Sequence, residues 1–141
     1  MTLQEEVLAF FESQDTKYLI KKGEEGEPDN IHIIVNGDHG NWEGIALCYE
    51  QERCLVFYVN LGMKVPQEKK QALAEWLFEK NYYYKYGGYY IDPPSGTLVV
   101  RNSVHVYGTE KERGMLIRQG ILTGAVMADQ DYEEIMKFIY A

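Results

Sequence analysis

The side chains that could hold a metal ion are scattered along this sequence. His32, His39 and His105 lie far apart, and none has a second ligand at the short spacing typical of a zinc site. The segment "NGDHGN" follows an acidic loop, but it lacks the alternating oxygen ligands and the closing glutamate of a calcium loop. We read it as a hairpin turn, expect each histidine to be structural or at the surface, and predict no metal and no cofactor.

The sequence motifs of catalysis are also missing. No Gly-rich phosphate loop opens a helix, and no G-x-S-x-G elbow or catalytic-cysteine context is present. Adjacent carboxylates fit solvated helix ends or a loop, as at Glu5/Glu6, Glu24/Glu25 and Glu133/Glu134. We therefore expect no catalytic residue and a protein that is not an enzyme, unless reactive groups converge only in space.

The two cysteines bear on redox chemistry. Cys48 and Cys54 flank the turn-like segment "YEQER" and could face each other across a hairpin. In a reducing compartment two free thiols are expected rather than a redox switch.

Charge and length limit the classes of partner. The 141 residues include 14 basic and 22 acidic ones, giving a net charge of -8, and a chain of this length fits a single domain, residues 1–141. Nucleic-acid binding needs a positive surface, and anionic membranes also attract basic segments, so we predict neither partner.

No apolar run approaches a membrane span, and Glu5 and Glu6 stand where a signal peptide would be basic, so we expect a cytoplasmic protein.

The segment Asn81–Tyr90, "NYYYKYGGYY", concentrates six of the twelve tyrosines. In a strand that begins after Gly88, Tyr89 and Tyr90 point to opposite faces. A buried tyrosine hydroxyl needs a hydrogen-bond partner, so we expect a division of the rings, with Tyr84 and Tyr89 packed in the core. Three further rings are either solvent-facing or part of a partner- or ligand-binding strip: Tyr83, Tyr86 and Tyr90.

The elements that must position these side chains follow from periodicity and turn residues. Thr2 and Glu5 form a capping box for a helix over 2–14. Four strands are predicted next, at 17–21, 31–35, 44–50 and 53–61, the last apolar on both faces and hence central or covered on both sides. A helix over 65–81, a hairpin around a turn at 92–96, a helix over 109–127 and a short helix from 131 complete the chain. This order predicts an α+β fold with helices packed against an antiparallel sheet.

Two features near the C-terminus are candidate contact surfaces. Gly120, Gly124 and Ala128 lie four residues apart and form one ridge of a helix, which either approaches the sheet closely or contacts a second copy in a homodimer. The final segment has an apolar stripe that either completes the core or forms a partner-binding arm. The stripe consists of Tyr132, Ile135, Met136 and Ile139.

A family resemblance is visible around the tyrosine segment. "VP" at 65–66 opens a helix, Asn81 is followed by Tyr84, Gly87, Tyr89 and Asp92, and Gly96 precedes a strand that ends at Arg101. Over roughly residues 31–127 this pattern resembles the YbjN-like family of proposed bacterial sensory-transduction regulators. The resemblance implies the fold of the type III secretion chaperones, an α-β-β-β-α-β-β-α chain, to which the segment 17–21 would add an extra strand.

The resemblance also implies a function. It suggests a chaperone-like or regulatory module, most often a homodimer, that holds another polypeptide on an apolar groove or sheet face. The alternative is a small-molecule-sensing domain with a tyrosine-lined pocket. An extended apolar patch would favour the first function, and a single concave pocket with a few polar groups would favour the second.

Overall fold

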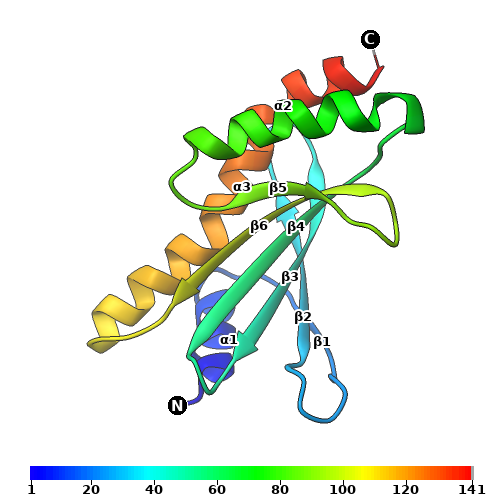
Figure 1. Ribbon diagram of the computed structural model, residues 1–141. Helices are drawn as coiled ribbons and strands as arrows, with labels where there is room; N and C mark the ends of the chain where they lie inside the picture. The colour runs from blue at the N-terminus through cyan, green and yellow to red at the C-terminus, as the bar shows by residue number, and fades with distance from the viewer. Residues whose placement is uncertain (141) are drawn as a thin grey trace.

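The computed structural model describes residues 1–140, so of the expected single domain only Ala141 lies outside it. A six-stranded antiparallel sheet in the order β1-β2-β3-β4-β6-β5 carries three α-helices, as the α+β prediction requires (Figure 1). The extra N-terminal strand is present. The elements are α1 (Leu3–Ser13), β1 (Leu19–Lys21), β2 (Asn30–Asn36), β3 (Asn41–Tyr49), β4 (Cys54–Lys64), the 3-10 turn η1 (Gln67–Lys69), α2 (Lys70–Tyr83), β5 (Gly88–Ile91), β6 (Thr97–His105) and α3 (Glu110–Tyr140).

The first helix is positioned by its cap and its apolar face. Thr2 and Glu5 form the predicted capping box, which satisfies two backbone N–H groups at the helix start. Leu3, Val7 and Phe11 lie on one side of α1 and are buried against the rest of the core.

The strands β2, β3 and β4 bury only one of their two faces. Burial alternates along each strand, so that Ile33, Ala46 and Phe57 are buried while their neighbours in sequence are partly exposed. Helix α1 packs on β3, and α3 packs on β4 and β6, which covers the buried face (Figure 1). Strand β4 is central, as predicted, but its second apolar face is only partly covered.

The second helix begins and ends later than predicted. Pro66 precedes the 3-10 turn, and the α-helix runs from Lys70 to Tyr83, past Asn81. Asn81 does not stop the helix. Its side-chain oxygen accepts the backbone N–H of Tyr89 at 2.7 Å and its nitrogen donates to the Tyr89 carbonyl at 2.9 Å, so it fixes the start of β5.

The predicted hairpin is present. β5 and β6 pair across the turn at 92–96, where Gly96 has φ +71°, a conformation that favours glycine. The Asp92 carboxylate accepts from the Ser95 hydroxyl at 2.7 Å and closes the turn.

The C-terminal helix differs from the prediction. A helix ending near Met127 and a second one opening at Asp131 were expected, but α3 is continuous over 31 residues. Asp131 is typical of a helix start because its carboxylate often caps backbone N–H groups. Here Asp131 is buried and accepts hydrogen bonds from Tyr84 and Tyr89. Its carboxylate therefore binds the α2–β5 region and does not cap a helix.

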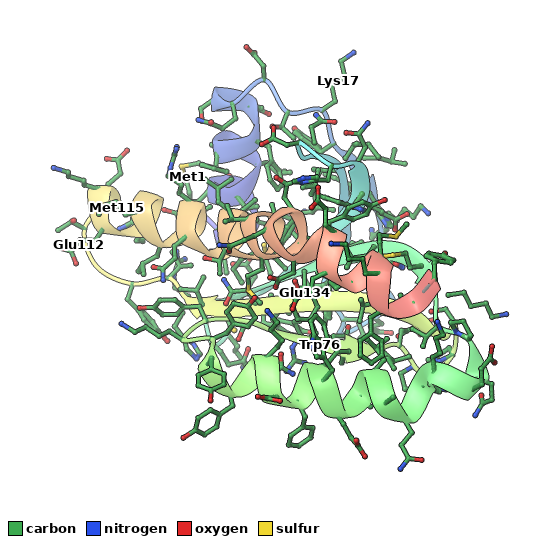
Figure 2. The ribbon with its side chains drawn as sticks, turned by 90° about the horizontal axis from the view of Figure 1, so that it is seen from above. Met1, Lys17, Trp76, Glu112, Met115 and Glu134 are labelled. Atoms are coloured by element: carbon green, nitrogen blue, oxygen red, sulfur yellow. The ribbon has the colours of Figure 1, made fainter. Side chains whose placement is uncertain are left out.

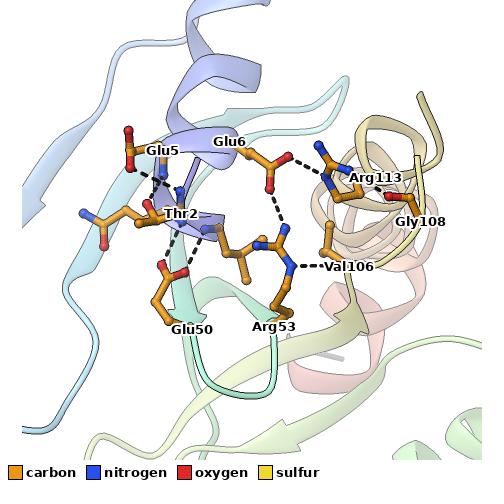
Figure 3. A network of polar contacts seen from close by, with 10 residues as sticks. Thr2, Glu5, Glu6, Glu50, Arg53, Val106, Gly108 and Arg113 are labelled. Atoms are coloured by element: carbon orange, nitrogen blue, oxygen red, sulfur yellow. Dashed lines mark hydrogen bonds and ion pairs between the residues drawn. The ribbon is translucent and has the colours of Figure 1, made fainter. Parts of the chain in front are cut away.

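A partly buried carboxylate joins three elements near the N-terminus (Figure 3). Glu6 of α1 accepts from Arg113 of α3 at 2.7 Å and forms an ion pair with Arg53 of the β3–β4 turn. Arg53 also donates to the Val106 carbonyl at 2.9 Å. Burial alone would raise the pKa of Glu6, but the hydrogen bonds from the two arginines outweigh it and hold that pKa below its usual range.

Candidate functional site

The uncovered face of β2–β4 is the first candidate surface, and we call it the open face. Strand pairing aligns His32, Ile45 and Tyr58 in one row across the three strands, with Leu19 of β1 opposite His32. The side chains of this face are partly or largely exposed, and Ile34 is 60% exposed. The open face consists of Leu19, Ile34, Ile45, Leu47, Val56 and Tyr58.

Polar groups lie among and beside the residues of the open face, since His32 stands between Leu19 and Ile45 and Glu43 stands opposite Ile34. His32 lies 3.4 Å from Glu43, and Arg101 of β6 stands beside Tyr58 in the strand register. Tyr90 of β5 packs edge-on against Tyr58 at 6.4 Å between ring centres. Burial, with Tyr58 nearby, raises the pKa of Tyr90 to about 12. Its hydroxyl is therefore neutral and can donate a hydrogen bond at ordinary pH.

The tyrosine segment divides much as expected. Tyr83 and Tyr86 are exposed, Tyr90 is partly exposed, and Tyr89 is buried. Tyr86, Tyr89 and Tyr90 line a cavity of about 590 Å³ between the α2–β5 loop and β6. The other lining side chains are polar or positively charged, and no carboxylate is among them: Asn81, Lys85, Arg101, Asn102 and Ser103.

Tyr84 and Tyr89 have a structural role. The Tyr89 hydroxyl lies 2.9 Å from Asp131, and Tyr84 donates to the same carboxylate. Burial, reinforced by that carboxylate, raises the pKa of both hydroxyl groups. Nearby, Lys80 pairs with Glu134 at 3.0 Å, in the space between α2 and α3 that Figure 2 shows around Glu134.

The glycine ridge of α3 faces the sheet. A Cβ atom added at Gly120 would lie 2.7 Å from Val104 and 3.2 Å from Leu55. At Gly124 the nearest atoms are 3.5 Å away, and Ala128 is fully buried. Of the two expectations, close packing on the sheet therefore describes this ridge, and the sheet occupies the place where a second copy would have to bind.

The apolar stripe of the final segment completes the core. Ile135 and Ile139 are buried, and Met136 packs partly buried beside them. Tyr132 lies 5.8 Å from the Trp42 ring and stacks on His39, whose backbone N–H donates to Asp129 at 2.9 Å. These side chains tie α3 to β3 and to the β2–β3 turn, and they do not form a separate arm.

The thiols do not face each other. Cys48 pairs with Leu55 on the buried face, whereas Cys54 pairs with Tyr49 on the opposite face, so the two thiols do not meet across the hairpin. Both cysteines are free. Burial raises the pKa of Cys48 to about 12, which keeps it a neutral and unreactive thiol.

The resemblance implied an apolar groove or a sheet face, but the residues of the open face were not among the site residues predicted from the sequence. The signal was available, since residues 53–61 are apolar on both faces, but it is equally typical of a strand covered on both sides. The exposed aromatic rings Phe78 and Tyr82 of α2 were also not predicted, because apolar periodicity identifies the buried side of a helix and not its exposed side. No helix within residues 1–140 is long and apolar enough to cross a bilayer.

Comparisons with known proteins agree with this architecture. No protein-family model matches the sequence, and no curated protein matches it either. The structure is similar to that of YbjN from E. coli, described as a proposed transcription regulator, with a TM-score of 0.65, 14% identity and coverage of 94% of this chain and 93% of that one. It is also similar to a chain in the structure of the HopA1–SchA chaperone–effector complex, with a TM-score of 0.55, 16% identity and 94% coverage of both chains. The chain thus has the YbjN and secretion-chaperone fold that the sequence pattern indicated.

Proposed function

We propose that this protein is a non-enzymatic, chaperone-like or regulatory module that binds another polypeptide on its open face. The observation that carries the proposal is the apolar group on the outer face of β3 and β4, which no helix covers within residues 1–140: Ile45, Leu47, Val56 and Tyr58. Exposed contiguous apolar surface is typical of protein–protein contact sites.

The fold comparison supports a polypeptide as the occupant. One structure with this fold comes from a chaperone–effector complex. The open face suits such a partner because a sheet offers a broad surface rather than an enclosed pocket, and apolar burial does not depend on one sequence.

The first experiment is to express the tagged protein in its native host, cross-link it gently and identify co-purifying polypeptides by mass spectrometry. We expect one polypeptide in stoichiometric amount. Ile34→Glu should reduce its recovery at least tenfold, because a carboxylate would be buried without a partner. Phe78→Glu is the matched control, since Phe78 is an exposed apolar side chain (81%) on another surface. Equal recovery with both variants would exclude the open face.

Small-molecule sensing is the second candidate function, and the tyrosine-lined cavity favours it. Its volume of about 590 Å³ is within the range of ligand sites, and Lys85 and Arg101 provide positive charge. A thermal-shift screen of anionic metabolites would detect such a ligand through stabilisation of the folded state. A hit whose effect disappears in Tyr90→Ala would support sensing, and a hit unaffected by that change would place its site elsewhere.

The homodimer remains a prediction. Light scattering of the purified protein should then give about twice the chain mass of 16.4 kDa. A mass equal to that of one chain would contradict it.

A further inference from the structure

The tyrosine-lined cavity lies between the α2–β5 loop and β6, where the loop comes back from α2 to the sheet (Figure 1). Gly87 of this loop has φ +72°, and a Cβ atom at Gly87 would lie 3.1 Å from the Arg101 carbonyl oxygen. Glycine at this position therefore lets the loop lie directly against β6 and form one wall of the cavity.

Hydrogen bonds of the fold hold both walls in place. The Asn81 side chain binds both backbone groups of Tyr89, at 2.7 and 2.9 Å, and the Tyr89 hydroxyl lies 2.9 Å from Asp131. On the β6 side, Asn102 donates to the Gly120 carbonyl at 3.4 Å. The walls are thus fixed by the protein itself, which lowers the entropic cost of binding a ligand.

Other polar groups of the cavity are not engaged by the fold. Within residues 1–140, the side chains of Lys85, Arg101 and Ser103 have no hydrogen-bond or ion-pair partner. The Tyr90 hydroxyl likewise has no hydrogen-bond partner among the described residues. Each of these groups can donate a hydrogen bond, so a ligand that complements them must offer acceptors.

The charge of the cavity is opposite to that of the chain. Lys85 and Arg101 bring positive charge to a cavity that no carboxylate of residues 1–140 lines, whereas the net charge of the chain is -8. Tyr90 pairs with Val99, so Arg101 is the diagonal neighbour of Tyr90 on the same face of the sheet. An anionic group therefore fits beside the Tyr90 ring, and the planar guanidinium group can hold a carboxylate through two parallel hydrogen bonds.

The aromatic lining and the size of the cavity indicate the rest of the ligand. Tyr86 and Tyr90 offer rings, and aromatic rings pack favourably against other rings, offset or edge-on. The volume of about 590 Å³ lies within the range of small-molecule sites, and a ligand of two fused rings fills more of it than a single ring does.

We propose that the tyrosine-lined cavity binds an aromatic carboxylate, whose rings contact Tyr86 and Tyr90 and whose carboxylate accepts hydrogen bonds from Arg101 and Lys85. This inference rests on the second candidate function, since it names the chemical class of the ligand for the same cavity. It does not involve the open face.

The test is a titration of the isotope-labelled full chain with 2-naphthoate, followed by NMR. Saturable shifts of the backbone amide signals of residues 85–90 and 101–103 are expected. 2-Naphthamide has the same rings without the charge, and decahydro-2-naphthoate has the charge without aromatic rings. Both should bind more weakly than 2-naphthoate, the amide by about tenfold and the saturated acid by about fivefold.

Two variants with matched controls test the assigned side chains. Arg101→Gln should weaken the binding of 2-naphthoate about tenfold, whereas Arg118→Gln, the same change at an exposed arginine outside the cavity, should leave it unchanged. Tyr86→Ala should weaken it about fivefold, and Tyr82→Ala, which removes an exposed ring of α2, should not. Tyr86 is 56% exposed, so its truncation tests the site even if Arg101→Gln fails to fold.

Several results would overturn the proposal. These are the absence of saturable binding, equal binding of 2-naphthoate and 2-naphthamide, equal binding of the saturated acid, or no effect of Tyr86→Ala. Binding of 2-naphthyl phosphate about tenfold tighter than that of 2-naphthoate would also overturn it, because the cavity would then select a phosphate.

The ligand class and the sensing function can fail separately. If another anion from the metabolite screen stabilises the protein and Tyr90→Ala removes the effect, while 2-naphthoate does not bind, the ligand class is wrong and sensing stands. If 2-naphthoate binds as expected but no metabolite of the screen does, sensing is wrong and the cavity remains a site for aromatic carboxylates. Recovery of a polypeptide that depends on Ile34 tests the open face independently of both.

Discussion

The glycines of α3 show how the absence of one carbon atom decides packing. Gly120 sits against Val104 and Leu55, so a methyl group there would have to displace branched side chains. Gly114 has no atom within 4 Å of its Cβ position. Gly120→Ala should therefore destabilise the protein by about 1–3 kcal/mol, whereas Gly114→Ala should stabilise it by about 0.5–1 kcal/mol through helix propensity. Urea unfolding of both variants measures the difference, and equal midpoints would show that α3 does not pack as described.

The tyrosine–aspartate cluster predicts a stability change at alkaline pH. The pKa values of Tyr84 and Tyr89 are raised above the ordinary 10.0 by burial and by Asp131. Above pH 10 the unfolded chain loses these two protons while the folded chain keeps them. The contribution of the two hydroxyl groups to the free energy of unfolding is therefore complete below pH 10 and is lost as the pH rises toward their pKa values in the folded chain. Urea midpoints between pH 8 and pH 11 should fall for the parent protein. The fall should be smaller in Tyr89→Phe, and an equal fall in both proteins would contradict this origin.

At the scale of elements, the Glu6 network joins α1, the β3–β4 turn and α3. The Glu6 side chain is only 12% exposed and faces two arginines, so Glu6→Gln should cost about 2 kcal/mol. Because its folded pKa is lower than its ordinary value of 4.5, its contribution is present above that pH and is lost as the pH falls through the folded value.

A control variant at a loop position separates the loss of the Glu6 contacts from the change in net charge. Glu25→Gln removes the same charge from the exposed loop after β1 and should change the urea midpoint little. The difference between the two variants should be large at pH 7 and should shrink below pH 4. A Glu6→Gln variant as stable as Glu25→Gln at pH 7 would show that the network contributes nothing measurable.

Some elements of this fold could be predicted from the sequence and others could not. The first helix, the strands and the hairpin follow from capping residues, alternation and turn residues, which are local signals, and their order was sufficient for the fold class. The continuity of α3 was missed because the partners of Asp131 are Tyr84 and Tyr89, more than 40 residues away. The residues of the open face were not predicted for a similar reason, since whether a helix covers a strand is decided by tertiary packing.

At the scale of the whole molecule, α3 connects both ends of the fold. Its N-terminal part contacts α1 through Arg113, its middle packs on the sheet, and its C-terminal part meets α2, where Phe138 lies 5.7 Å from Trp76 (Figure 1). Ile135 and Ile139 are buried in the same core as the residues of α1. The other two helices and the sheet are therefore all held together by α3.

This dependence predicts the effect of truncation. Deletion of residues 130–141 removes Asp131, Ile135 and Ile139 from the core, and each lost large aliphatic side chain alone costs about 2–5 kcal/mol. Because a domain of this size is stable by only about 5–15 kcal/mol, we expect the shortened chain to unfold, with loss of its cooperative thermal transition in circular dichroism. Deletion of Tyr140 and Ala141 alone is the control and should preserve the transition, since Tyr140 is 66% exposed. A folded protein lacking residues 130–141 would show instead that this segment is an independent arm.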